Sequence, residues 1–243
     1  LQRQKQYKTC GILNGIDVDA FNPATDPDIA KNYDIDTFQE GKAVCKAALQ
    51  DEMNLHKDGS PVMGMVTRLV GHKGVDLVRA IAEGLLQQGI ELVILGSGEA
   101  QYENFFNELC ARNPGRVGVY IGFNAKLAQQ IYAGADMFLM PSRSEPCGLA
   151  QMVSCRYGTI PIVRETGGLR DSIHDSGDGF GNGFTFANYN AHELYEACWR
   201  AKEGYWQKEG WSILVRRAME CDFSWSNSAK SYEGLYNEVV NLW

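Results

Sequence analysis

Short apolar runs alternate with longer amphipathic segments through the middle of the chain, and this alternation limits the folds that it can adopt. The apolar runs expected to be strands are residues 62–66, 92–95, 117–121, 137–140, 160–163 and 183–186. The segments between them that are expected to be helices are residues 74–88, 101–112, 127–133 and 149–157. Apolar strands that alternate with helices form parallel sheets covered on both faces. The sequence therefore predicts an α/β protein with a parallel sheet of about six strands and helices on both faces.

The chain divides into three parts around this pattern. Residues 1–38 are irregular, with turn and breaker signals such as Asn22-Pro23, and are interpreted as a linker. Residues 39–220 are the α/β domain, which we expect to begin with a helix and to end with two more. The helices expected outside the alternating region are residues 39–52, 194–208, 212–220 and 226–242, the last one capped by Ser224 or Ser226.

The composition excludes several classes of protein. The 23 Lys and Arg residues face 30 Asp and Glu, a net charge of −7, which argues against a nucleic-acid partner because a duplex binder needs a basic face. No window approaches the roughly 20 apolar residues of a membrane span, so we expect no membrane partner. The polar N-terminus does not fit a signal peptide, and its lack of an initiator Met predicts a chain processed or cut from a longer one. Seven scattered cysteines favour reduced thiols in a cytosol-like compartment, and no Cys-x-x-Cys or His-x-x-x-His pair indicates zinc.

The loops after the strands are the candidate site, because a doubly wound sheet binds its ligand beyond the carboxyl ends of its strands. After the first strand, Arg68 and Lys73 flank a loop whose Gly74 opens a helix. Two cations beside a helix N-terminus suit an anion, especially a pyrophosphate. No P-loop motif surrounds Lys73, however, and a pair of solvated loop cations is about equally consistent with the spacing.

Two glycine-containing turns follow later strands. Residues 96–101 read Gly-Ser-Gly-Glu-Ala-Gln, in which Gly98 is the second glycine and Gln101 occupies the place of the third glycine of a dinucleotide fingerprint. An NAD-dependent oxidoreductase is therefore a weak interpretation; a tight turn is favoured, with close approach to a ligand still open. Gly167 and Gly168 offer backbone amides to an anion or form a simple turn, and the two readings are equally open.

The segment 145–149, Glu-Pro-Cys-Gly-Leu, lies between a strand and a helix. Gly148 lets the backbone come close to a ligand, and the amides of Gly148 and Leu149 would face the crevice. Glu145 is either a first-turn helix charge worth under about 1 kcal/mol, which chemistry alone slightly favours, or a group that receives sugar hydroxyls or assists a developing cation. Cys147 has no visible base to activate it and is interpreted as a small lining residue.

Several strings taken together resemble the glycogen and starch synthases, a family of sugar-nucleotide glucosyltransferases. The strings are Gly11-Ile12-Leu13-Asn14-Gly15-Ile16-Asp17, Phe21-Asn22-Pro23, Arg68-Leu69, Lys73-Gly74, Pro141-Ser142-Arg143-Ser144-Glu145-Pro146-Cys147-Gly148-Leu149, Thr166-Gly167-Gly168-Leu169 and Asp222-Phe223-Ser224-Trp225. They occur in the family's order from about residue 9 to the end. The resemblance implies the C-terminal, nucleotide-sugar-binding half of a GT-B fold, in which two Rossmann-like halves face each other across a cleft. It also implies that the N-terminal half is missing, so that the chain alone should show negligible turnover.

The resemblance implies roles for individual residues. Arg68 and Lys73 match cations on the diphosphate and would stabilise the ADP leaving group. Glu145 matches the carboxylate near the glucose, thought to orient its hydroxyls and support an oxocarbenium-like transition state. Phe123 falls where the family often has a Tyr that stacks on adenine, and Asn14 matches a polar linker residue on the acceptor side. The other candidate binding residues are Gly98, Cys147, Gly148, Leu149, Gly167 and Gly168.

Two positions depart from the family's pattern. Ala150 stands where many relatives have Thr and lacks the hydroxyl that contacts phosphate there, and Val153 stands where related retaining transferases have a second Glu. No metal and no cofactor are implied, because Arg, Lys and helix dipoles would neutralise the diphosphate. In the family the last helix crosses back to the N-terminal half, although packing on its own domain is equally open for residues 221–243. Its apolar stripe would be Tyr232, Leu235, Tyr236, Val239, Val240 and Trp243.

The predicted function is retaining transfer of glucose from ADP-glucose to the non-reducing end of an α-1,4-glucan. UDP-glucose stays open as the donor, because no single position reads the base. The alternative is a stand-alone nucleotide-binding or regulatory module without catalysis. The expected partners are the sugar nucleotide, the glucan acceptor and the chain's own N-terminal domain, in the cytoplasm if the source is a bacterium and in the plastid if it is a plant or alga.

Overall fold

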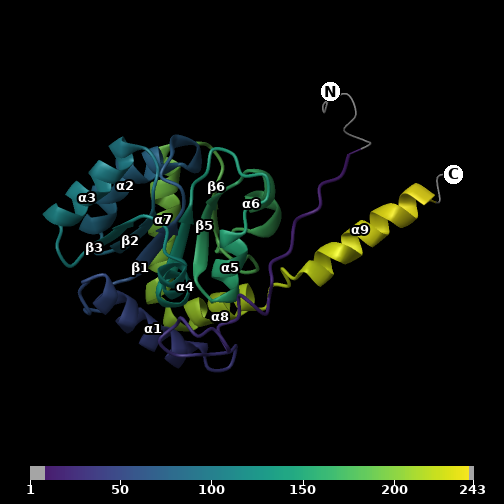
Figure 1. Cartoon of the computed structure of the whole chain (residues 1–243), viewed down its shortest axis with the longest axis horizontal. Coiled ribbons are helices and arrows are strands. Elements are labelled where there is room, and N and C mark those ends of the chain that lie inside the picture. The colour runs from purple at the N-terminus through teal and green to yellow at the C-terminus, as the bar shows by residue number, and fades with distance from the viewer. Residues whose placement is uncertain (1–8, 241–243) are drawn as a thin grey trace.

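Six strands form one parallel sheet at the centre of the chain, in a computed structural model that describes residues 9–240 (Figure 1). The strands are β1 (Val62–Val66), β2 (Glu91–Gly96), β3 (Val117–Ile121), β4 (Met137–Met140), β5 (Ile160–Arg164) and β6 (Phe184–Phe186). Their order is β3-β2-β1-β4-β5-β6, and every neighbouring pair is parallel. This is the doubly wound order of Rossmann-like folds, and the predicted fold class is confirmed.

Helices cover both faces of the sheet. They are α1 (Phe38–Glu52), α2 (Val75–Gln87), α3 (Ala100–Arg112), α4 (Ala125–Gly134), α5 (Ala150–Arg156), α6 (Gly167–Ser172), α7 (Ala191–Trp206), α8 (Lys208–Met219) and α9 (Trp225–Val240), with two 3-10 turns, η3 (Gly71–Lys73) and η4 (Ser176–Asp178). Helix α2 packs against α3 and α7 in one layer, and α4 packs against α1 and α5 in the other. The sequence pattern did not delimit α6, because six residues are too few to show a helical period.

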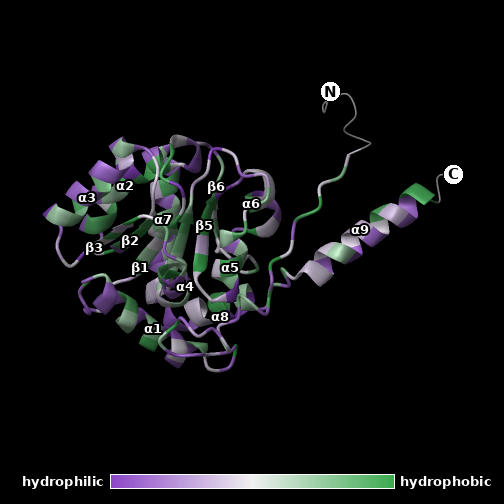
Figure 2. Ribbon diagram, in the orientation of Figure 1, coloured by the Kyte–Doolittle hydropathy of each residue, from purple (hydrophilic) through white to green (hydrophobic). Residues whose placement is uncertain are grey.

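The core is the sheet itself, buried on both of its faces. Val93 on β2, Phe138 on β4 and Ile162 on β5 are completely inaccessible to solvent. Figure 2 shows this as hydrophobic strands in the middle of the molecule, beneath helices of mixed character. Strands of this kind have no polar face, which explains why their sequences read as continuous apolar runs.

The irregular N-terminal part consists of two segments that pack against different parts of the molecule. Tyr33 is buried and donates a 2.7 Å hydrogen bond to the carbonyl of Tyr157, so the segment before α1 packs on the α/β domain. The earlier residues run beside the start of α9 (Figure 1), where the Ile16 amide donates to the Phe223 carbonyl at 2.8 Å and the Ser228 hydroxyl donates to the Leu13 carbonyl at 2.8 Å.

Helix α9 extends away from the rest of the molecule (Figure 1). The Asn227 amide donates to the Ser224 side chain at 3.2 Å, so Ser224, one of the two predicted caps, caps this helix. Ser226 lies inside the helix instead. Of the described part of α9, only Ser228 is buried.

Candidate active site

The two loops that carry the strongest candidate residues follow neighbouring strands. Strand β1 pairs with β2 on one side and with β4 on the other, so the chain order of the sheet reverses between β1 and β4. The loop after β1 carries Arg68 and Lys73, and the loop after β4 carries Glu145. A reversal of this kind opens a crevice at the carboxyl ends of the strands, which is where ligands of such folds bind.

Lys73 and Glu145 meet across this crevice. The Lys73 ammonium lies 2.5 Å from one oxygen of the Glu145 carboxylate, and the side chains are only 20% and 10% exposed. The Ser142 hydroxyl lies 3.5 Å from the same carboxylate oxygen. Partial burial of both groups makes this a stronger ion pair than one in open solvent. The pair fixes a carboxylate and an ammonium side by side at the floor of the crevice.

Gly74 allows the two loops to come this close. Its φ of +76° lies in the left-handed region, and a Cβ atom at this position would stand 2.1 Å from the carbonyl oxygen of Pro141. The contact continues through the amide of Arg143, which donates to the His72 carbonyl at 2.9 Å. Only glycine satisfies both the conformation and the space, so Gly74 positions Lys73 against the Glu145 loop.

Gly167 and Gly168 play the same part on the other side of the Glu145 loop. A Cβ on Gly167 would lie 2.2 Å from the Glu145 carbonyl oxygen, and one on Gly168 would lie 2.1 Å from the Cys147 carbonyl oxygen. The Gly168 amide also donates to the Glu145 carbonyl at 3.1 Å. This amide is therefore engaged within the chain, and the two glycines serve first to seat the backbone of Glu145.

The turn before α5 is held by a buried glutamine that the sequence did not single out. The Gln151 amide nitrogen donates to the carbonyls of Cys147 and Gly148 at 3.1 and 3.0 Å and lies 3.1 Å from the Ser172 hydroxyl. Its amide oxygen is buried without a hydrogen-bond partner among the described residues. Gly148 has a φ of +70°, and the Leu149 side chain is half exposed. Cys147 is a partly buried free thiol.

Arg68 is exposed and forms no side-chain hydrogen bond or ion pair with any residue between 9 and 240 that the structure describes. Gly98 lies close to the same loop, since its Cβ would stand 2.3 Å from the Leu69 carbonyl oxygen. The Gly98 amide donates to the Glu103 carboxylate at 2.7 Å. The packing of the two loops therefore accounts for this glycine, while the guanidinium of Arg68 is free to meet a ligand.

Tyr189 contacts the loop after β1 and the loop after β4, a role that the sequence did not predict. Its hydroxyl donates to the Asp76 carboxylate and lies 3.1 Å from the Gly71 carbonyl oxygen. Burial, and then Asp76, raise the pKa of this phenol to about 12. The guanidinium of Arg143 lies 4.4 Å from the centre of the Tyr189 ring, and Arg164 donates to the Ser142 carbonyl at 3.0 Å. Tyrosine and arginine outside recognisable motifs give no sequence signal for such a role.

The two remaining candidates lie apart from the ion pair. Phe123 follows β3 and is 91% exposed, so its ring is available for stacking. Asn14 lies in the segment beside α9, next to Gly15, whose Cβ would stand 2.3 Å from the Trp225 amide nitrogen. The structure therefore does not bring Asn14 into contact with Lys73 or Glu145.

Neither a metal site nor a membrane span is found in the described part of the chain. Residues 9–240 hold no group of three His, Cys, Asp or Glu side chains that could bind a metal ion. None of the helices described here is long and apolar enough to cross a membrane.

Comparison with known protein families shows which family the chain belongs to. The profile of the family described as "Glycosyl transferases group 1" matches residues 48–209, a span that includes the whole sheet and both loops of the ion pair. The chain belongs to the group 1 glycosyltransferases. This group 1 glycosyltransferase carries its ion pair between β1 and β4, at the carboxyl edge where folds of this kind bind their ligands.

Individual relatives and a solved structure show which members of the family the chain resembles. The chain is 51% identical over 98% of its length to the glycogen synthase of Desulforudis audaxviator and 47% identical over 99% to that of Bacillus cereus. It spans about half of these relatives, 48% and 51% of their lengths. The catalytic domain of starch synthase IV from Arabidopsis thaliana, "bound to ADP and acarbose", superposes with a TM-score of 0.90 at 38% identity, over 99% of this glycosyltransferase and 51% of that chain. The predicted resemblance to the glycogen and starch synthases is confirmed.

Proposed function

We propose that the chain is the nucleotide-sugar-binding half of a retaining glucosyltransferase that moves glucose from ADP-glucose to the non-reducing end of an α-1,4-glucan. The observation that carries this proposal is the Lys73–Glu145 pair at the reversal point of the sheet. The names of the relatives, glycogen synthases and a starch synthase described with ADP and acarbose, support the donor and the acceptor. The source decides between the cytoplasm of a bacterium and a plastid as the compartment.

In the proposed reaction the cations act on the leaving group. Charge builds on the diphosphate as the bond to glucose breaks, and fixed cations at that position lower the barrier. Arg68, exposed and without a protein partner among the described residues, would grip phosphate oxygens with two donors. Lys73 has three donors, one of which Glu145 occupies, so the others remain for the diphosphate.

Glu145 would act on the sugar. Its carboxylate is held by Lys73 and lies near the Ser142 hydroxyl, which gives it one orientation beside the glucose. There it would accept hydrogen bonds from sugar hydroxyls and balance positive charge at the anomeric carbon. The turn of Cys147, Gly148 and Leu149 would line the sugar and phosphates, and Phe123 would stack on the adenine.

The proposed whole enzyme needs a second half to supply the opposite wall of the cleft. Helix α9 offers a surface for it, because Tyr232, Tyr236, Val239 and Val240 lie exposed along the helix at 38%, 64%, 48% and 71%. Trp243, the last residue of the predicted stripe, lies outside the described residues. We propose that this stripe packs on the N-terminal half of the enzyme.

Glucosyl transfer by the completed enzyme tests the function. The chain is joined to an N-terminal half from a related glycogen synthase, and radiolabelled glucose is followed from ADP-glucose and from UDP-glucose into glycogen. The expected result is transfer by the joined protein, loss of transfer in its Glu145→Gln variant, and negligible transfer by the chain alone. Absence of transfer from both donors by a joined protein that is folded would contradict the proposal.

A further inference from the structure

A cavity of about 610 Å³ lies far from the ion pair, at the opposite end of the sheet. It is bordered by η4, which precedes β6, and by the second half of α7 together with α8. Helix α7 starts after the carboxyl end of β6 and has 16 residues, so it runs roughly 24 Å from the edge with the catalytic loops to this cavity. A volume of this size matches sites for small organic ligands, which measure about 300–1,000 Å³.

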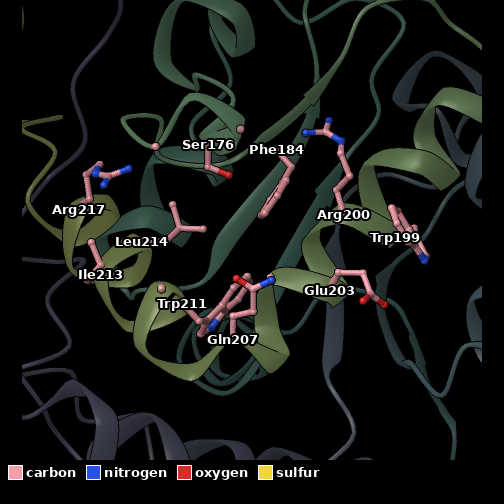
Figure 3. Close-up of a pocket in the computed structure, with 14 residues that line it drawn as sticks. Ser176, Phe184, Trp199, Arg200, Glu203, Gln207, Trp211, Ile213, Leu214 and Arg217 are labelled. Carbon is pink, nitrogen blue, oxygen red and sulfur yellow. The ribbon is translucent and has the colours of Figure 1, made fainter.

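The floor and one rim of the cavity are aromatic. Phe184 is buried, and Figure 3 shows it in the middle of the view, between Arg200 and Trp211. The Trp211 ring packs edge-on against the Tyr205 ring, with 5.6 Å between the two ring centroids. Trp199, at the rim, is 44% exposed although it is one of the largest apolar side chains in the protein. The exposed ring of Trp199 offers flat apolar surface at little cost in entropy, and the more buried Phe184 and Trp211 complete the apolar lining.

Two of the three charged side chains that line the cavity form ion pairs within the chain. Arg200 pairs with Asp175 at 2.8 Å, and Glu203 pairs with Lys202 at 3.0 Å. Arg217 donates to the Gly181 carbonyl at 2.8 Å. Arg217 has no ion-pair partner among the described residues, so its guanidinium leaves one positive charge beside the cavity. A guanidinium donates to hydroxyl groups as well as to anions, so the aromatic lining decides the class of ligand.

Polar groups nevertheless surround the rings. The Gln207 side chain forms no hydrogen bond with any residue in the described part of the chain, and it lies beside Trp211 in Figure 3. Ser176 and the remaining donors of Arg217 border the same space. A ligand that suits this lining must present flat apolar faces to the rings and hydroxyl groups to the edges. Pyranose rings do both, with C–H groups on their faces and hydroxyls on their rims.

We infer that this cavity is a second carbohydrate site, separate from the catalytic crevice, which binds a neutral segment of an α-linked glucan. The choice of a glucan as the ligand rests on the proposed function. A polymer held here keeps its chain ends near the enzyme, because a second attachment raises the effective concentration of the first. No chemistry takes place in the cavity, since its role is to retain the polymer.

Native electrophoresis of the 243-residue chain in gels with and without dissolved glycogen tests this site. The wild-type chain should be retarded by glycogen, and Trp199→Ala and Gln207→Ala should each weaken the apparent affinity about fivefold or more. The matched control is Trp206→Ala. Trp206 is a similarly exposed tryptophan at the end of the same helix, α7, and it does not line the cavity. The control should be retarded like the wild type. Circular dichroism checks that each variant is folded.

Titration of the same proteins with ADP separates this inference from the proposed function. Trp199→Ala should bind ADP as the wild type does. Retention on glycogen that depends on Trp199 supports the second site even if ADP does not bind, and in that case the proposed donor site fails alone. A chain that binds ADP but is not retarded by glycogen, or whose retardation survives in folded Trp199→Ala, overturns the second site alone.

Discussion

The Lys73 ammonium and the Glu145 carboxylate lie 2.5 Å apart, although 72 residues separate them in the chain. The sheet order brings them together, because the loops after β1 and β4 are neighbours only if those strands are. The pair occupies the point where doubly wound folds bind their ligands. It therefore links the topology of this group 1 glycosyltransferase to its proposed chemistry.

Removal of one partner of the Lys73–Glu145 pair should destabilise the fold more than removal of one partner of an exposed ion pair. Lys73→Met leaves the Glu145 carboxylate partly buried without its counter-charge, which should lower the free energy of unfolding by about 1–3 kcal/mol in urea titrations. Lys57→Met is the control, because Lys57 and Asp51 are 48% and 67% exposed, and it should cost at most about 1 kcal/mol. The double variant Lys73→Met/Glu145→Gln should regain part of the loss. Equal losses of unfolding free energy in Lys73→Met and Lys57→Met would contradict the partial burial of the Lys73–Glu145 pair.

Two glycines with the same backbone conformation should respond differently to alanine. Gly74 and Gly89 have φ values of +76° and +77°, but a Cβ on Gly89 would meet nothing within 4 Å. Gly89→Ala should therefore cost only the left-handed penalty of about 1–2 kcal/mol. Gly74→Ala should cost at least about 1 kcal/mol more, because its Cβ forces the Pro141 loop outward. Similar denaturation midpoints for the two variants would exclude the close contact of the loops.

A buried carboxyl outside the active site should make stability depend on pH. Glu91 is inaccessible to solvent, and burial raises its pKa to about 7, against the opposing hydrogen bond from Gln50. A raised folded-state pKa gives stability that is complete below the ordinary value and is lost as pH rises through 7. Glu91→Gln should therefore gain about 1–3 kcal/mol relative to wild type between pH 5 and pH 8.

Urea titrations at several pH values measure this gain. Glu52→Gln, at an exposed position of α1, is the control and should follow the wild-type profile. A constant difference between Glu91→Gln and wild type across this pH range would show that Glu91 stays ionised in the folded state.

The exposed stripe of α9 should matter for assembly and not for folding. Tyr236→Glu places a charge at a position that is 64% exposed, so the unfolding free energy of the chain should change by no more than about 0.5 kcal/mol. Association with an N-terminal half from a related glycogen synthase, followed by analytical ultracentrifugation, should be lost. Glu238→Lys, two residues along and hence on another face of the helix, should associate normally. Association of the Tyr236 variant at wild-type strength would place the docking surface elsewhere.

The sequence was sufficient for the strands and for the loops that follow them. Apolar runs such as residues 62–66 mark buried parallel strands whatever their order, and the motifs around Lys73 and Glu145 indicated the edge at which we propose the site. The contact between these two side chains was not predictable, because it depends on the pairing of β1 with β4 and on the approach that Gly74 permits.

Other features carried no local signal at all. Gln151 and Tyr189 act through hydrogen bonds to residues distant in the sequence, Ser172 on α6 and Gly71 after β1, and neither residue type is diagnostic of such a role. The sequence left close approach to a ligand open at Gly98 and an anion-binding amide open at Gly168, whereas the fold engages the two amides with Glu103 and with the Glu145 carbonyl. The aromatic cavity joins η4, α7 and α8 and appears only when these elements are assembled.

Isothermal titration of the 243-residue chain with ADP tests the central claim most directly, because it measures the proposed donor site by itself. One ADP should bind per chain, and Arg68→Ala and Lys73→Ala should each weaken binding about tenfold or more, the usual cost of losing a charge-assisted hydrogen bond. Lys57→Ala should leave the affinity unchanged. No binding of ADP, or the same affinity in all four proteins, would contradict the assignment of this edge as the nucleotide-sugar site.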